Sequence, residues 1–187
     1  MMSSKPAIFV DRDGTLNDLV GYLNDVDAFE LYPWSHEAIR LINGSGFLAV
    51  VVTNQSGVAR GIYSEELVRT VHSRMTEMLE GADARLDGIY YCPHATSGDC
   101  ECRKPKSGMV ERARQDFEID MSRSWVVGDS YSDLEMAWNA DARAALVLTG
   151  YGRGNYEHHK DLWGRQPDIV APNLYSAVVE IVWEASK

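Results

Sequence analysis

Two aspartates separated by a single residue, Asp11 and Asp13, follow a short apolar run at residues 7–10. Such a run predicts a buried strand, and side chains at alternate positions of an extended segment point to the same side. The two carboxylates are therefore expected to form a pair, which is unfavourable unless a cation binds or one carboxyl is protonated. Magnesium prefers carboxylate oxygens and is the cation that we expect. An acidic turn after a strand is the simpler alternative.

A carboxylate pair of this kind could hydrolyse a phosphate monoester in two steps. Asp11 is the expected nucleophile, forming an aspartyl-phosphate. Asp13 is expected to protonate the leaving alkoxide and then to deprotonate the attacking water. Thr53 closes a second apolar run and offers a hydroxyl to a phosphoryl oxygen, while Arg103 and Lys104 supply positive charge near the phosphate. Catalysis would then rest on positioning and charge neutralisation.

A third carboxylate, Asp129, follows a later apolar run at residues 125–127. It is the expected remaining protein ligand of the magnesium ion. Asp133 lies at the start of the next predicted helix, where the helix dipole stabilises a carboxylate without any further role. A functional and a structural interpretation of Asp133 therefore stand equal, and the same question is open for Ser130.

All three cysteines of the chain fall in one loop with a histidine, in the pattern Cys92-x-His94-x5-Cys100-x-Cys102. Three thiolates and one imidazole are the ligand set of a closed, structural zinc site. The alternatives are three buried thiols beside an exposed histidine, or a redox pair, and neither explains the clustering. Because Arg103 directly follows Cys102, zinc binding by the loop at residues 92–104 is expected to position the cationic residues.

The hydrophobic pattern alternates between strands and helices. Strands are predicted at residues 7–10, 47–53, 88–91, 125–127, 145–148 and 168–171; helices are predicted from residue 35 to about 43, at 64–79, at 107–117, after residue 130 and at 174–185; and loops are predicted at 16–33 and 149–166. This alternation predicts an α/β fold, a Rossmann-like parallel sheet of about six strands with helices on both faces. The polar strand ends should then converge at the carboxyl edge of the sheet.

Composition limits the possible functions. The chain has 187 residues and a formal net charge of −10, which suits one domain over residues 1–187 and argues against nucleic-acid or membrane-surface partners. Neither a membrane-spanning run nor a signal peptide is found, so a cytoplasmic location is expected. The expected partner is a small phosphorylated substrate, and the chain is expected to be a monomer.

The chain resembles the haloacid-dehalogenase-like (HAD) phosphatases over nearly its whole length. Within them it is similar to the subfamily of D-glycero-D-manno-heptose 1,7-bisphosphate 7-phosphatases and histidinol-phosphate phosphatases. The residues that carry the resemblance are Asp11-Arg12-Asp13-Gly14-Thr15, Thr53-Asn54-Gln55-Ser56-Gly57-Val58-Ala59-Arg60-Gly61, Cys92-Pro93-His94, Cys100-Glu101-Cys102-Arg103-Lys104-Pro105 and Val127-Gly128-Asp129.

This resemblance implies a HAD core without a separate cap domain. It also implies magnesium at Asp11, Asp13 and Asp129, and structural zinc at the four loop ligands. Lys104 would steady the phosphoryl group. The substrate-binding residues that we expect are Gly21, Tyr22, Asn54, Gln55, Ser56, Arg60 and Arg103.

The exact substrate is less determined than the reaction. The segment at residues 55–61 and the later segment Thr149-Gly150-Tyr151-Gly152 look more like the heptose enzymes, which favours removal of the 7-phosphate. Leu19 and Val20 stand where heptose enzymes often carry polar residues, and Ser130 stands where a basic residue is frequent. Histidinol phosphate as substrate, and a zinc-stabilised binding module without catalysis, remain the alternatives.

Overall fold

A six-stranded, all-parallel sheet with helices on both faces forms the structure, a computed structural model that describes residues 4–187. Its strands are β1 (Ala7–Val10), β2 (Leu48–Asn54), β3 (Gly88–Cys92), β4 (Trp125–Gly128), β5 (Arg143–Val147) and β6 (Ile169–Ala171). Its helices are α1 (Ser35–Gly44), α2 (Glu65–Glu80), α3 (Gly108–Phe117), α4 (Tyr131–Asn139), α5 (Gly152–His159) and α6 (Leu174–Ala185), with short 3-10 turns η1 (Val26–Ala28), η2 (Met121–Arg123) and η3 (Lys160–Leu162). The predicted α/β fold class is confirmed.

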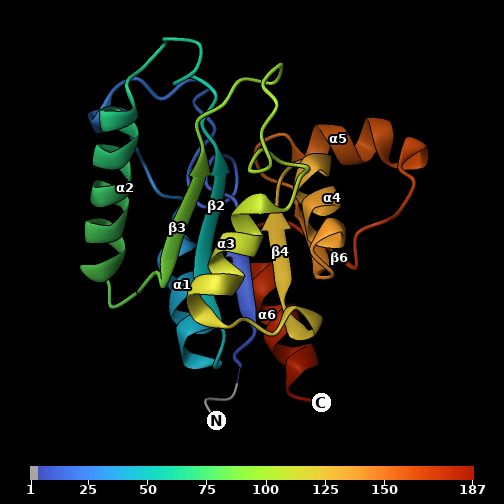
Figure 1. Cartoon of the computed structure of the whole chain (residues 1–187). Coiled ribbons are helices and arrows are strands. Elements are labelled where there is room, and N and C mark those ends of the chain that lie inside the picture. Colours follow the sequence, from blue (N-terminus) through green and yellow to red (C-terminus); the bar gives the residue numbers. More distant parts are fainter. Residues whose placement is uncertain (1–3) are drawn as a thin grey trace.

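The strand order is β3-β2-β1-β4-β5-β6, so the direction in which strands are added reverses between β1 and β4. All residues of β1 and β4 are buried. β1 consists of four consecutive apolar residues and pairs with β2 on one side and β4 on the other, as expected of a strand covered on both faces of the sheet. In sheets of this kind, ligands bind beyond the carboxyl ends of the strands at the point of reversal. The carboxyl ends lie at the top of Figure 1, where the strand arrows point.

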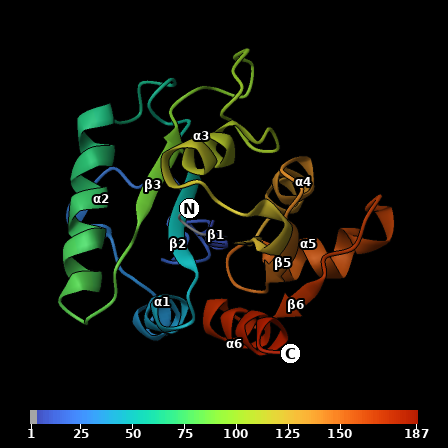
Figure 2. The same cartoon turned by 60° about the horizontal axis from the view of Figure 1, so that its bottom comes forward.

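Two apolar layers sandwich the sheet. One face is covered by α1, α2 and α6, whose inward residues include Ile39, Met75 and Ile181. The other face is covered by α3 and α4, through residues such as Met109 and Leu134. Figure 2 shows α1 and α6 on one side of the strands and α3 and α4 on the other. This two-sided cover holds the ends of β1 and β4 rigidly in place.

The segment at residues 149–166, predicted as a loop, is instead largely helical, so this prediction is wrong. It contains α5 and the 3-10 turn η3. The apolar period that predicts a helix is missing because Gly152 is the single buried residue of α5. A Cβ atom at residue 152 would clash with Val147 O, so α5 contacts the end of β5 through a residue that has no side chain. Elsewhere the element boundaries differ from the prediction by one or two residues.

No helix within residues 4–187 has both the length and the apolar character needed to cross a bilayer.

Candidate active site

The carboxyl ends of β1, β2 and β4 and the loop after β3 open into one cavity of about 430 Å³. Polar and charged groups from all four segments reach it, as the topology predicts. The residues that line it are Asp11, Asp13, Leu19, Gly21, Tyr22, Thr53, Asn54, Ser56, Arg103, Lys104, Asp129, Ser130, Ser132 and Tyr151. Residues more than a hundred positions apart in the sequence therefore share one site.

A buried lysine lies between two carboxylates at the floor of this cavity. Lys104 Nζ donates to Asp11 Oδ1 and to Asp133 Oδ1, each at 2.6 Å. Burial alone would lower the pKa of Lys104, but the charges of Asp11 and Asp133 raise it, so the ammonium stays charged. A fixed positive charge therefore lies directly beside the expected nucleophile.

Asp133 has a structural and an electrostatic role together. Its second oxygen, Oδ2, accepts from Ser130 N at 3.1 Å and from Ser130 Oγ at 2.6 Å, which completes a capping box at the start of α4. Its first oxygen accepts from Lys104. The contacts of Asp133 are thus compatible with both interpretations that the sequence left equal, and Ser130 caps α4 and lines the cavity.

Asp129 is held at the end of β4 by the backbone of two loops. Its Oδ2 accepts from Tyr151 N at 2.8 Å. The Cα atoms of Gly14 and Gly150 approach this carboxylate so closely that a Cβ at either position would clash with it. Both glycines also have positive φ, +86° and +52°, which other residues rarely adopt. Glycine, which has no Cβ, is therefore needed at residues 14 and 150 to leave room for the Asp129 carboxylate.

The carboxylates of Asp11 and Asp129, which lie at the ends of β1 and β4, are poorly stabilised as anions. Burial, together with the neighbouring Asp133, raises the pKa of Asp11 to about 7 despite the opposing effect of Lys104. Burial, together with the charges of Asp11 and Asp133, raises the pKa of Asp129 to about 8. One buried ammonium is thus insufficient for three buried carboxylates, and a further cation would stabilise the charged forms.

The donor set fits a magnesium ion. Ligand oxygens of Asp11, Asp129 and Asp133 all lie within 4.8 Å of one another. Both oxygens of Asp133 already accept hydrogen bonds, whereas Asp11 Oδ2 and Asp129 Oδ1 accept none from residues 4–187. Magnesium is commonly held by one or two carboxylates together with substrate phosphate and water. Asp11 and Asp129 are the side chains that offer those oxygens.

Asp13 lines the cavity, and three neighbouring side chains donate hydrogen bonds to its carboxylate. Arg12 Nη2 donates to both of its oxygens, at 2.9 and 2.8 Å. Asn17 Nδ2 donates to Oδ1 at 3.1 Å, and Gln55 Nε2 donates to Oδ2 at 2.8 Å. Because β1 ends at Val10 and the chain turns at Arg12, Asp13 does not belong to the group of Asp11, Asp129 and Asp133, whose ligand oxygens lie within 4.8 Å of one another. A role for Asp13 as magnesium ligand stays a prediction.

The predicted polar residues after β2 fall into two groups. Thr53, Asn54 and Ser56 line the cavity, and Asn54 Oδ1 accepts from Lys104 N at 3.2 Å. Gln55 is instead buried and donates to Asp13 and, at 3.0 Å, to Thr53 Oγ1. Contact of Thr53, Asn54 and Ser56 with substrate is consistent with their placement, whereas Gln55 lies behind Asp13.

The remaining predicted substrate contacts lie at the mouth. Gly21, Tyr22 and Arg103 line the cavity, and Arg103 Nη1 donates to His94 O at 3.2 Å. Arg60 Nη1 donates to Tyr22 Oη at 2.6 Å, which ties the loop after β2 to the loop after β1. Arg60 is thus placed to hold Tyr22, and direct contact with a substrate stays a prediction.

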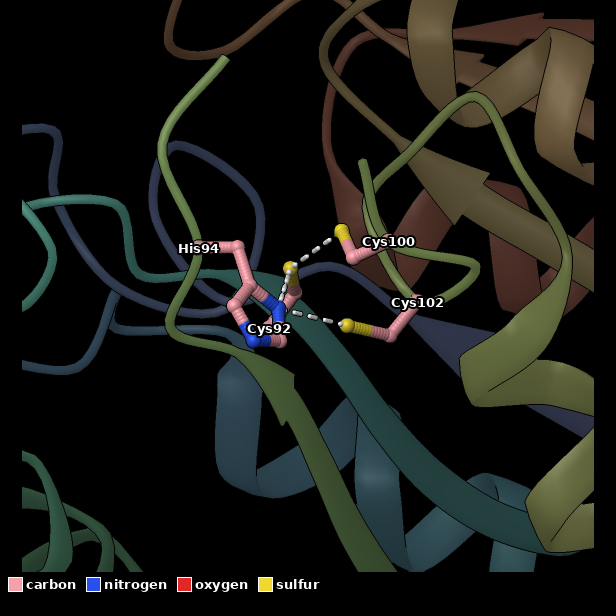
Figure 3. Close-up of side chains that lie close together, drawn as sticks. All are labelled: Cys92, His94, Cys100 and Cys102. Atoms are coloured by element: carbon pink, nitrogen blue, oxygen red, sulfur yellow. Dashed lines mark hydrogen bonds between the residues drawn. The ribbon is translucent and has the colours of Figure 1, made fainter. Parts of the chain in front are cut away.

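The four loop ligands converge as the zinc prediction requires (Figure 3). Cys92 Sγ lies 3.8 Å from Cys100 Sγ and 3.6 Å from His94 Nδ1, which lies 3.2 Å from Cys102 Sγ. Donors bound to one tetrahedral zinc at Zn–S ~2.3 Å and Zn–N ~2.0–2.1 Å are about 3.5–3.8 Å apart. The residues fit a closed zinc site, and no disulfide links the cysteines.

Sequence reasoning missed the residues that surround Asp13 from behind. Arg12 and Asn17 donate to it directly, His72 is connected to it through Arg12, and Tyr63 is connected to it through Gln55. His72 alone left a usable signal, because it interrupts the apolar face of α2 next to Val71. A buried histidine on such a face needs a partner. Leu19, Ser132 and Tyr151 also line the cavity without having been predicted.

Comparisons with known proteins agree with this geometry. A model of the HAD-hydrolase-like family matches residues 101–177. The D-glycero-D-manno-heptose-1,7-bisphosphate 7-phosphatase of Thermosynechococcus vestitus is 38% identical, over 93% of this chain and 94% of its own length. The D-glycero-beta-D-manno-heptose-1,7-bisphosphate 7-phosphatase of Escherichia coli K12 is 44% identical, over 80% of this chain and 83% of its own length.

A solved structure has nearly the same fold. The D,D-heptose 1,7-bisphosphate phosphatase of B. bronchiseptica, complexed with magnesium and phosphate, superposes with a TM-score of 0.87 at 30% identity. The match covers 96% of this chain and 99% of that chain. The similarity therefore extends over nearly the whole chain.

Proposed function

Since this chain belongs to the HAD-like phosphatase family of the heptose-1,7-bisphosphate 7-phosphatases, we propose that it removes the 7-phosphate of D-glycero-D-manno-heptose 1,7-bisphosphate with magnesium as cofactor. The observation that carries the proposal is the arrangement at the reversal point of the sheet. There, a charged Lys104 lies against Asp11, and Asp11 and Asp129 each keep one carboxylate oxygen available. HAD phosphatases act through such strand-end carboxylates.

In the proposed reaction one carboxylate oxygen of Asp11 attacks the phosphorus atom, and the other is left for the cation. The bond from phosphorus to the sugar oxygen breaks, and that oxygen receives a proton from Asp13. A water then gives a proton to Asp13 and attacks the aspartyl-phosphate, which releases phosphate and restores Asp11. A bound magnesium ion would supply positive charge to the phosphoryl oxygens and to Asp11 and Asp129.

The other residues orient the phosphate and the sugar. Lys104 holds Asp11 in place and offers its charge to the phosphoryl group, and the Thr53 hydroxyl is free to donate, since it accepts from Gln55. Asn54, Ser56, Ser132 and Arg103 surround the cavity with hydrogen-bonding groups. A ring of such groups suits a sugar with many hydroxyls better than the flat imidazole of histidinol phosphate.

A steady-state comparison tests this proposal. With magnesium present, the protein should release phosphate from the heptose bisphosphate with a higher kcat/KM than from histidinol phosphate. Asp11→Asn is the control that removes turnover of both. A reversed preference would assign the alternative substrate, and release from neither would favour a zinc-stabilised binding module.

The zinc site is proposed to be structural. Four protein ligands leave no open position for water on the metal. Elemental analysis of gently purified protein should give about one zinc per chain, unaffected by added magnesium. Protein free of zinc but fully folded in the loop would contradict this assignment.

We also infer that residues 1–187 form one domain without a separate cap, and that the enzyme is a cytoplasmic monomer. All six strands described belong to one sheet, which supports the single domain. Size-exclusion chromatography with light scattering should give the mass of one chain, 20.9 kDa.

A further inference from the structure

The guanidinium of Arg12 is buried behind the active site with partners on two sides. Arg12 is 2% exposed, although it lies in the motif between the two aspartates. On one side it donates to Asp13, through Nη2 at 2.9 and 2.8 Å and through Nε at 3.2 Å. On the other side its Nη1 lies 3.2 Å from His72 Nε2, on helix α2. Arg12 therefore bridges a helix on the face of the sheet and a carboxylate of the cavity.

The direction of the contact with His72 follows from chemistry. A guanidinium has donors and no acceptor, so His72 Nε2 must accept and its ring must be neutral. Burial, and next the charge of Arg12, lower the pKa of His72 to about 3, while the charge of Asp13 opposes them. The imidazole is thus a permanent acceptor at any working pH.

The imidazole is itself fixed in place. His72 is 7% exposed, and its ring packs edge-to-face on Tyr91, with the ring centroids 5.4 Å apart. Tyr91 lies on β3 and donates its hydroxyl to Glu65 Oε1 at 2.6 Å. The acceptor for Arg12 is therefore set by the packing of α2 against β3, not by groups of the cavity.

A second chain of contacts holds Asp13 from its other side. Tyr63 Oη donates to Gln55 Oε1 at 2.8 Å, which fixes the amide so that its Nε2 donates to Asp13.

Without the acceptor on His72, Arg12 would be left with a buried, unpaired donor. It would then turn toward other acceptors and release one edge of the Asp13 carboxylate.

We propose that His72 is a positioning residue, which acts through Arg12 to hold the Asp13 carboxylate where it exchanges a proton with the leaving group. This inference rests on the proposed phosphatase function, in which Asp13 is the general acid. His72 is not among the residues that line the cavity, and its contact with Asp13 runs through Arg12.

The dependence on the leaving group separates positioning from a general loss of structure. A sugar phosphate releases an alkoxide, which requires a proton from Asp13. p-Nitrophenyl phosphate releases a stable phenolate that leaves without one. General acid catalysis typically contributes ~10²–10⁴-fold, so misplacing Asp13 should affect the first substrate far more than the second.

The test variant is His72→Phe, which keeps an aromatic ring beside Tyr91 and removes the acceptor. We expect its kcat on the sugar phosphate to fall about tenfold or more, a part of the full general-acid contribution. Its kcat on p-nitrophenyl phosphate should change less than about threefold. His72→Gln, whose amide oxygen replaces Nε2 as acceptor, should recover most of the lost kcat. His72→Met repeats the test if the Phe variant unfolds.

Met75→Leu is the matched control, because Met75 is buried one turn along the same helix and has no part in these contacts. Met75→Leu should lower kcat on the two substrates to the same small extent. Equal losses on both substrates in His72→Phe, or no recovery in His72→Gln, would overturn the inference while leaving the phosphatase function intact. Absence of turnover of either substrate by the unaltered protein would instead overturn the proposed function.

Discussion

The two candidate metal centres of this protein are built in opposite ways. The proposed zinc ligands all lie within residues 92–102, at the end of β3 and on the loop that follows it. The carboxylates proposed to hold magnesium lie at the ends of β1 and β4, and the lysine beside Asp11 comes from the loop beyond the proposed zinc ligands. Lys104 reaches across 93 residues of sequence to Asp11. One centre is local in the chain, and the other exists only when the sheet has formed.

This difference has energetic consequences. A short loop with few apolar residues has little folding energy of its own, and zinc binding to such sites contributes ~10–16 kcal/mol apparent. The carboxylate centre is instead held by the packed sheet, and its buried like charges oppose folding until a cation binds. The zinc centre is therefore expected to stabilise the protein, while the carboxylate centre uses the stability of the sheet for function.

The largest expected effect is at the nucleophile. Asp11→Asn should abolish turnover of any phosphomonoester, since an amide cannot form the aspartyl-phosphate. Asp13→Asn should lower kcat on a sugar phosphate by ~100-fold or more. Circular dichroism and phosphate release measure fold and turnover separately. A loss of only a few-fold with either variant would contradict the assigned roles.

The next effect tests whether the two centres are coupled. Cys100→Ser should lower activity in the same way as Lys104→Ala, because the zinc loop positions the lysine that follows it. The effect of Lys104→Ala is expected to be large, since it leaves the buried carboxylates of Asp11 and Asp133 without their cation. The double variant should lose much less than the product of the two losses. Independent, multiplying effects in kcat/KM would show that the loop does not position Lys104.

A smaller effect concerns the backbone around Asp129. Gly150→Ala should reduce activity about 10-fold or more, because the new Cβ meets the Asp129 carboxylate in a backbone conformation that alanine disfavours. Gly154→Ala is the matched control, since no atom lies within 4 Å of the position of its Cβ. Higher magnesium concentrations should partly restore Gly150→Ala if displacement of Asp129 is the cause. Equal activity of Gly150→Ala and Gly154→Ala would contradict the role of Gly150 in leaving room for the Asp129 carboxylate.

The smallest effect is a shift of stability with pH. The raised pKa values of Asp11, about 7, and Asp129, about 8, mean that their neutral forms favour the folded state. In magnesium-free protein this stabilisation is complete below pH ~4 and is lost as the pH rises through 7 to 8. Added magnesium should therefore raise the Tm more at pH 8 than at pH 5.5, by about 2–4 °C per kcal/mol of binding energy. The same comparison in Asp129→Asn should show a smaller magnesium effect, and an equal magnesium effect at both pH values would disagree with these pKa shifts.

Much of the site could be predicted because its motifs are short and sit at strand ends. The apolar run before Asp11 and the spacing of Cys92, His94, Cys100 and Cys102 both report local geometry, which the covalent chain determines. The alternation of strands and helices predicted the parallel sheet, and parallel sheets bring their carboxyl ends together. Those features needed no knowledge of tertiary contacts.

The tertiary structure alone decided which partner each charged group has. The sequence predicted that Asp13 would lie near Asp11, but not that Arg12, Asn17 and Gln55 would donate to its carboxylate. It left Asp133 with two equal interpretations, and only the fold brought this carboxylate into contact with Lys104, 29 residues away in the sequence. It also predicted a loop where α5 packs through Gly152. The physical reason is the same each time: burial makes a charge or a close backbone contact depend on groups distant in sequence, and no local spacing records them.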